Sequence, residues 1–179
     1  DPAFRQLLVR WFQWGTFCPV MRLHGDRSPQ TPLTHADGSP TMATGADNEI
    51  WSFGDENTPI LEKYIRLREK MRPYIRELMK EAHELGRPVI RPMFYEFPGD
   101  RTCWNLQEQY MFGGDLLVAP IVYEDTYERE VYLPEGAGWQ LLYDGSEFAG
   151  GQTVKVSAEI GQIPVFIRDG RRSELIGGI

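Results

Sequence analysis

Cysteine is scarce in this sequence of 179 residues. Its two cysteines, Cys18 and Cys103, lie far apart, belong to no CxxC pair and have no cluster of histidines nearby. This pattern predicts neither a zinc site nor a disulfide framework. We expect both cysteines to be reduced residues of the core.

Positive charge and long apolar runs are also scarce. Lysine and arginine number 19 against 26 acidic residues, which gives a net charge of -7 and argues against nucleic acid as a partner. No stretch approaches the ~20 apolar residues of a membrane span, so no membrane partner is expected. Hydrophobic residues make up 41% of the chain, which is enough for a packed core, and we expect a soluble protein of the cytoplasm or periplasm.

Motifs for several kinds of chemistry are absent from the sequence. It has no GxSxG, HExxH, P-loop or GxGxxG pattern, so nothing predicts a serine nucleophile, a zinc peptidase or a nucleotide cofactor. His35 and His83 stand alone, and we expect both to be structural. We therefore predict no metal and no cofactor.

The spacing of the acidic residues does not single out a pair of carboxylates for acid–base catalysis. Acid–base catalysis needs two acids that project into one cleft with different pKa values. The candidates share only their position in a loop rich in Gly, Pro and Ser: Asp26, Asp37, Asp47, Glu49 and Asp55. Read from the residues alone, the reaction is undetermined.

A short apolar run at residues 17–23 ends among polar side chains that include Arg22 and His24. This pattern is typical of a buried strand that emerges at a working face. Two interpretations stay open at this point. The residues form either an ordinary strand end with solvated charges, or a site where an Arg or a His binds a ligand or transfers a proton.

Two helices are predicted from apolar residues three and four apart. The first covers residues 4–14, with Asp1 as N-cap, Pro2 at the first helical position and Gly15 at its end. The second covers residues 58–85, with Thr58 as N-cap and Gly86 after its end. Because a proline removes a backbone donor, Pro73 predicts a kink near residues 71–73.

Residues 26–57 form a long loop that contains an aromatic island at residues 49–54. Trp51 and Phe53 lie in this island and need a surface on which to bury their rings. Either the island packs over the strand end, or Trp51 stacks on a sugar as part of a pocket wall.

After Gly86 the pattern changes to short alternating runs separated by turn residues. These runs predict strands at residues 89–97, 109–112, 116–122, 129–133, 139–143, 153–156 and 164–168. Several short strands at this spacing are typical of an antiparallel sandwich or barrel. The predicted fold class is therefore α/β plus all-β, with the boundary near Gly86.

One family resemblance runs along the chain in collinear order. RWFQWGTFCPVMRLHG at residues 10–25 resembles the last strand region of the catalytic barrel in glycoside hydrolase family 31, the α-glucosidase and α-xylosidase family. The likeness continues in WSFG (51–54), LREKMRPYI (67–75), RPMFYEFP (91–98) and QYMFGGDLLVAP (109–120).

The resemblance implies the end of a (β/α)8 TIM barrel followed by a β-sandwich. Residues 1–86 would form the C-terminal part of the barrel, with the last strand at residues 17–23 and the closing helix at 58–85. Residues 87–179 would form the proximal C-terminal β-sandwich. The chain would then be a fragment, and it would require the upstream barrel of the same polypeptide.

The resemblance also implies a retaining, exo-acting α-glycosidase that hydrolyses terminal α-linked sugars of oligosaccharides. The two catalytic aspartates of the family lie on earlier barrel strands, so no catalytic residue is expected here and the fragment is expected to be inactive. By the same resemblance, His24 would hydrogen-bond sugar hydroxyls and Arg22 would orient that subsite. The Arg22-Leu23-His24 sequence favours the α-xylosidase branch and leaves α-glucosidase activity open.

Two rival hypotheses remain. The sandwich after Arg87 would instead be a non-catalytic carbohydrate-binding or scaffold module, with Trp104, Trp139 and Tyr143 as a stacking platform. Alternatively, the chain would be an unrelated α/β enzyme whose likeness to the family arose by chance.

Overall fold

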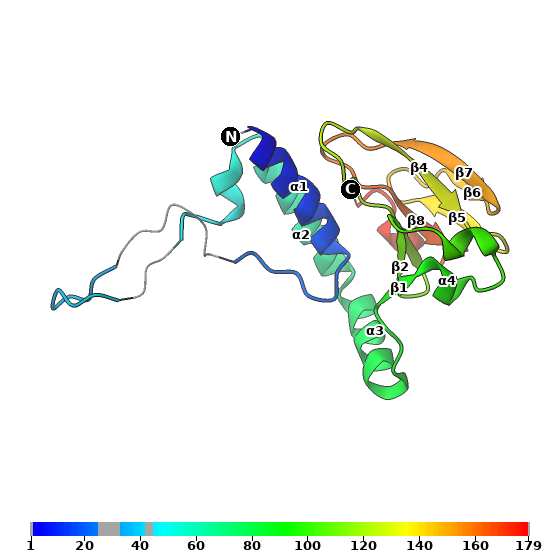
Figure 1. Ribbon diagram of the computed structural model, residues 1–179, viewed down its shortest axis with the longest axis horizontal. Helices are drawn as coiled ribbons and strands as arrows, with labels where there is room; N and C mark the ends of the chain where they lie inside the picture. Colours follow the sequence, from blue (N-terminus) through cyan, green and yellow to red (C-terminus); the bar gives the residue numbers. More distant parts are fainter. Residues whose placement is uncertain (1, 25–32, 42–44, 179) are drawn as a thin grey trace.

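A computed structural model describes residues 2–24, 33–41 and 45–178. A six-stranded antiparallel sheet lies between a layer of helices and a second, two-stranded sheet (Figure 1). In spatial order the large sheet contains β1 (Ile90–Pro92), β2 (Tyr110–Phe112), β3 (Leu116–Val118), β8 (Val165–Arg168), β5 (Gly138–Leu141) and β6 (Glu147–Ala149). The small sheet pairs β4 (Glu128–Leu133) with β7 (Gln152–Ser157). The predicted antiparallel sandwich is confirmed.

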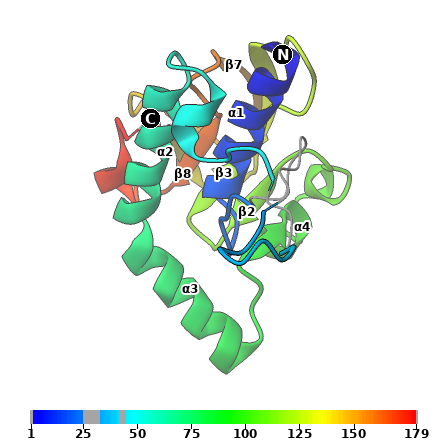
Figure 2. The ribbon, with the colours of Figure 1, turned by 90° about the vertical axis from the view of Figure 1, so that its left-hand side faces the viewer.

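The central strands of the large sheet are buried on both faces. Side chains alternate along a strand, so Leu116 and Ile167 pack in the cluster that contains the helices, whereas Leu117 and Phe166 pack in the cluster that contains the small sheet. Figure 2 shows the helices in front of this sheet. The unbroken apolar runs in β3 and β8 follow from this burial on two sides.

The first helix, α1, runs over Pro2–Thr16, which confirms the predicted helix and the place of Pro2 in its first turn. Gly15 lies inside the helix, so its predicted role as the helix end is wrong. The hydroxyl of Thr16 donates to the carbonyl of Phe12 at 2.9 Å and extends the last turn past the glycine. The predicted N-cap, Asp1, lies outside the described residues.

The long second helix is two helices, α2 (Thr58–Lys70) and α3 (Arg72–Leu85). They meet at Met71, where Pro73 was expected to cause a kink. Thr58 is the first helical residue rather than the N-cap, which is Asn57. Gly86 ends α3 with φ +66, the left-handed conformation that a glycine tolerates best.

The predicted strand at residues 17–23 is wrong, since the chain forms a turn and then an irregular coil there. A strand in the middle of a parallel barrel is held by hydrogen bonds to a neighbour on each side. In this chain both sheets are built from Ile90 onward, and the carbonyls of residues 16–19 bond to side chains instead.

The predicted strands after Gly86 are shorter in the structure. The run at residues 89–97 divides into β1 and the short helix α4 (Met93–Glu96), because Pro92 has no N–H to donate and the buried side chain of Met93 turns inward. The run at 116–122 ends as a strand at Val118. The short edge strand β6 was not predicted. The described residues also contain three short 3-10 helices: η1 (Ile50–Phe53), η2 (Arg101–Trp104) and η3 (Ser173–Leu175).

The described part of the long loop contains little regular structure, as predicted. Thr34 and Pro40 form an isolated antiparallel bridge, and Gly38 turns the chain between them with φ +82. Figure 1 shows this turn projecting far from the helices and sheets.

Candidate functional site

The coil after α1 carries Arg22 and His24, the two residues assigned to a sugar subsite. Both side chains are exposed. In Figure 1 the coil leaves the C-terminal end of α1 and runs away from the sheets. The side-chain amide of Asn48 donates to the backbone carbonyl of His24. This contact ties the coil to the chain just before η1, which contains Trp51.

The start of the same coil is held by side chains from two other elements. Tyr110 of β2 donates its hydroxyl to the carbonyl of Phe17 at 3.0 Å. Burial raises the pKa of this hydroxyl, which therefore stays protonated and able to donate. Arg68 of α2 donates to the three neighbouring carbonyls, those of Thr16 (2.7 Å), Cys18 (2.6 Å) and Pro19 (2.9 Å).

The aromatic island of the loop separates into two environments. Phe53 is buried against the helices, with its ring centroid 6.4 Å from that of Phe4, so this residue packs as a core group, but on α1 and not over the expected strand end. Trp51 lies in the same turn of η1 and is 67% exposed. Its indole is available to a ligand, and its expected sugar-stacking role stays a prediction.

The described loop acids have local roles or face solvent. Asp37 accepts hydrogen bonds from the backbone N–H and the hydroxyl of Ser39, and these bonds lower its pKa. Glu49 accepts from the hydroxyl of Ser52 at 3.3 Å. Asp47 is exposed, as is Asp55, whereas Asp26 lies outside the described residues. The geometry gives no reason to select two of these acids as a catalytic pair.

An apolar groove of about 620 Å³ runs along α1, beside residues 120–124. Trp11 is 68% exposed there, and three further large apolar side chains of α1 that line the groove are also exposed: Phe4, Leu7 and Trp14. A contiguous exposed patch of large aromatic side chains is typical of a surface that binds another part of a protein.

On the sheet side, α1 and α2 are joined to the loop at residues 158–162 by what we term the carbonyl clasp, made of Arg10, Gln13, Lys63 and Tyr64. Arg10 is 6% exposed and donates to four backbone carbonyls: Thr126 (3.0 Å), Ala158 (2.7 Å), Glu159 (3.1 Å) and Gln162 (2.7 Å). Gln13 donates to the carbonyl of Ile160 at 2.7 Å. Lys63 and Tyr64 both donate to that of Gly161.

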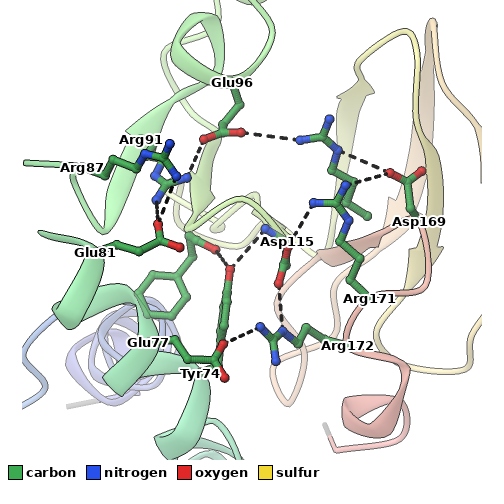
Figure 3. Close-up of polar contacts among 12 residues, drawn as sticks. Tyr74, Glu77, Glu81, Arg87, Arg91, Glu96, Asp115, Asp169, Arg171 and Arg172 are labelled. Atoms are coloured by element: carbon green, nitrogen blue, oxygen red, sulfur yellow. Dashed lines mark hydrogen bonds and ion pairs between the residues drawn. The ribbon is translucent and has the colours of Figure 1, made fainter. Parts of the chain in front are cut away.

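A second polar junction lies between α3 and the large sheet, and Figure 3 shows its arginines and carboxylates. We term it the ion-pair cluster: Glu77, Glu81, Arg87, Arg91, Glu96, Asp115, Arg168, Asp169, Arg171 and Arg172. Asp115 accepts from Arg172 at 2.8 Å, and Arg91 lies 2.6 Å from Glu96. The sequence shows these residues as scattered charges with no common spacing, so sequence analysis missed both junctions.

The proposed stacking platform of Trp104, Trp139 and Tyr143 does not form. Trp139 is 1% exposed and donates its indole N–H to the carbonyl of Pro134 at 3.2 Å. Trp104 is exposed but stacks on Phe94 with a ring separation of 5.1 Å. A buried tryptophan cannot present its face to a sugar, so this part of the binding-module hypothesis is wrong.

Both cysteines are free and buried, as expected. Burial raises the pKa of each thiol, that of Cys103 to about 12. Within residues 2–24, 33–41 and 45–178, no three His, Cys, Asp or Glu side chains gather into a group able to hold a metal ion. In that same part of the chain, no helix combines the length and apolar character needed to cross a membrane.

Two family models match successive parts of the chain. The model described as the glycosyl hydrolases family 31 TIM-barrel domain matches residues 1–78. The model described as the glycosyl hydrolase family 31 C-terminal domain matches residues 86–171.

Relatives and solved structures agree with these matches. An α-xylosidase of Saccharolobus solfataricus is 35% identical over 98% of this chain, and α-glucosidase 2 of Bacillus thermoamyloliquefaciens is 37% identical over 92% of it. An α-xylosidase from a soil metagenome, whose crystal structure was solved in complex with xylose, is 47% identical in sequence over 98% of this chain. Its structure matches that of this chain with a TM-score of 0.92. The chain spans only 22%, 19% and 26% of these proteins, respectively.

Proposed function

The chain belongs to glycosyl hydrolase family 31, and we propose that it forms part of a retaining, exo-acting α-glycosidase that removes terminal α-linked sugars from oligosaccharides. The observation that carries this proposal is the similarity, over 98% of the chain, to an α-xylosidase solved with xylose. A retaining mechanism uses one carboxylate as nucleophile and another as acid and base. Because the described loop acids have local roles or face solvent, we assign this pair to a preceding part of the polypeptide.

The role of this chain is to bind the sugar. We assign His24 to hydrogen bonds with sugar hydroxyls, Arg22 to the orientation of that subsite, and Trp51 to the pocket wall. All three side chains are exposed, and the backbone of His24 is bonded to Asn48, three residues before Trp51 in the chain. This one contact and the exposure of all three side chains support a shared surface for the three residues.

The apolar groove along α1 supports the proposal that the chain is one part of a larger barrel. Its occupant would be the preceding barrel of the same polypeptide, which would cover Trp11 and the other exposed apolar residues of α1. We place the boundary between the barrel part, residues 1–86, and the sandwich part, residues 87–179, at Gly86, where α3 ends.

A hydrolysis assay with p-nitrophenyl α-xyloside and α-glucoside tests the function. The complete enzyme is expected to turn over these substrates, with the α-xyloside preferred, and the isolated chain is expected to be inactive. Turnover by the isolated chain would show that the catalytic carboxylates do not lie in a preceding part of the polypeptide. A complete enzyme inactive on both substrates would overturn the proposed function.

Replacement of His24 tests its role in sugar binding. In the complete enzyme, His24→Ala is expected to lower kcat/KM by about a hundredfold, because sugar hydroxyls lose a partner in a desolvated subsite. His35→Ala, in the projecting turn of the long loop at residues 26–57, is the matched control and is expected to retain full activity. An unchanged kcat/KM for His24→Ala would remove His24 from the site.

A further inference from the structure

We propose that Arg68 and Tyr110 are positioning residues for the sugar subsite, a proposal that rests on the proposed function. Neither residue is placed in contact with the sugar. They fix the backbone from which the chain continues to Arg22 and His24. The sandwich part, through Tyr110, thereby helps to shape a binding site carried by the barrel part.

The C-terminal end of α1 needs donors from elsewhere. The last carbonyls of a helix have no partner within the helix and carry partial negative charge. The last turn of α1 contains no basic residue, and the described coil of residues 17–24 forms no strand that would pair its carbonyls. Arg68 of α2 supplies both the charge and the hydrogen bonds, with all three contacts between 2.6 and 2.9 Å.

A flat guanidinium suits this task because its N–H groups point in fixed directions. Arg68 is half-buried, and burial lowers its pKa, yet an arginine remains charged in proteins. A lysine at this position would place one nitrogen where the guanidinium places two, so it cannot reach the three carbonyls in the same way.

The second anchor comes from β2 of the large sheet. Tyr110 and Phe112 lie two residues apart and so on one face of this strand. The hydroxyl of Tyr110 binds the carbonyl of Phe17, while the ring of Phe112 meets the ring of Phe17 edge-on at 6.3 Å. Because β2 pairs with both β1 and β3, this anchor is a rigid one.

The segment that carries the subsite therefore lies between two fixed points. Residues 16–19 are held at its start, and Asn48 holds the carbonyl of His24 at its other end. A displacement of about 1 Å in a group that orients a substrate can lower the rate strongly. Loss of the hydrogen bonds from Arg68 or Tyr110 to residues 16–19 is therefore expected to weaken sugar binding, while the remote carboxylates keep their arrangement.

Steady-state kinetics of the complete enzyme test this inference. Arg68→Lys and Tyr110→Phe are each expected to raise KM for the α-xyloside about tenfold, with kcat within about twofold of the wild type. Tyr132→Phe and Arg66→Lys are the matched controls, because they remove the same groups from side chains with partners elsewhere: Tyr132 donates to Asp100, and Arg66 pairs with Glu62. Both controls should leave KM unchanged.

A double-mutant cycle separates positioning from a general loss of stability. If Arg68 acts through His24, Arg68→Lys should change kcat/KM less than twofold in a His24→Ala background, whereas independent sites would give additive effects. Additive effects, or an unchanged KM in both anchor variants, would overturn the inference. A wild-type enzyme that hydrolyses neither substrate would instead overturn the proposed function.

Nuclear magnetic resonance of the 179-residue chain tests the anchors without any activity. Tyr110→Phe and Arg68→Lys should shift the amide signals of residues 20–24, and Tyr132→Phe, which removes a hydroxyl bonded to Asp100, should not. Unshifted signals in both anchor variants would contradict the positioning role, whichever substrate the enzyme takes.

Discussion

The carbonyl clasp and the ion-pair cluster both join the helices to the part of the chain after Gly86. They differ in the groups that surround their charged side chains. In the clasp, the cation Arg10 is bound by neutral backbone oxygens and the side-chain oxygen of Gln13. In the cluster, arginines and carboxylates alternate, as Figure 3 shows around Asp115. Arg10, Gln13 and Tyr64 of the clasp are buried. In the cluster, the exposed fractions of the Arg172 and Glu77 side chains are 23% and 57%.

This difference predicts different responses to mutation and to salt. A buried carbonyl that loses its donor costs about 1–3 kcal/mol, and dissolved ions do not reach it. An ion pair that is partly exposed contributes less, and its contribution falls as salt screens it. The clasp should therefore contribute more to stability, and the cluster should make the stability depend on salt.

The largest effect is expected from Arg10→Met. Four carbonyls lose their shared donor, so the free energy of unfolding should fall by about 3–4 kcal/mol, measured by urea denaturation. The loss should be the same at low and high salt. Arg5→Met, on the same helix but in an exposed pair with Glu56, is the control and should cost less than about 0.5 kcal/mol. A loss from Arg10→Met that halves in high salt would contradict the comparison.

Gly113→Ala tests the close packing beside the cluster. Gly113 has φ +62, and a Cβ there would lie 2.2 Å from the hydroxyl of Tyr74. We expect a loss of about 3 kcal/mol in the free energy of unfolding, from backbone strain and displaced packing together. Gly136→Ala provides the control, because Gly136 has φ +79 with open space around it, so it should cost only about 1 kcal/mol. Equal losses would show that packing against Tyr74 contributes nothing.

Arg172→Met removes one arginine of the cluster. Arg172 pairs with Asp115 at 2.8 Å and with Glu77 at 2.7 Å, so the expected loss is about 1–2 kcal/mol at low salt. In about 1 M NaCl, where the screening length is about 3 Å, the loss should fall by about half. A loss that does not change with salt would make the cluster equivalent to the clasp.

The smallest effect concerns Asp100, a charge held by neutral donors inside the sandwich part. Although burial acts to raise its pKa, hydrogen bonds from the backbone of Glu135, the hydroxyl of Tyr132 and the backbone of Thr102 lower it overall. A lowered pKa in the folded state stabilises the fold above the unfolded value of about 3.9. This stability is lost as the pH falls through the folded pKa.

Asp100→Asn should therefore reduce the loss of stability between about pH 5 and pH 2, by less than about 1 kcal/mol because the group is partly exposed and water screens its charge. Thermal unfolding across this pH range measures the effect. Asp144→Asn is the control for an exposed turn, since the hydrogen bonds that lower the pKa of Asp144 come from Ser146, two residues along the chain. A steeper acid loss in Asp100→Asn would reverse the assigned sign.

Sequence patterns predicted most of the elements, because each depends on neighbours within a few residues. Pro2 and the apolar spacing of α1 predicted that helix, and Gly86 predicted the end of α3. Alternating residues predicted β4 and β7 almost to their bounds. The strand at residues 17–23 was wrong because only the start of this apolar run is buried, with Phe17 against Phe112, whereas Val20 and Leu23 are exposed.

The candidate site was predicted only as a set of residue types. The family resemblance selected Arg22 and His24, and the structure adds that both are exposed. Nothing in the spacing pointed to Arg68 or Tyr110, because each lies far along the chain from the carbonyl that it binds. A side chain that satisfies a distant backbone group leaves no periodic pattern in the sequence.

By itself, then, the sequence determined most of the helices and strands and the family, since local conformation and burial periodicity act over a few residues. Only the tertiary structure decided which buried carbonyls receive which donors. Arg10 meets carbonyls of the loop at residues 158–162, and Tyr110 meets that of Phe17. The physical reason is that an irregular backbone segment has no hydrogen-bond partners of its own, so its conformation is fixed by the surfaces packed against it.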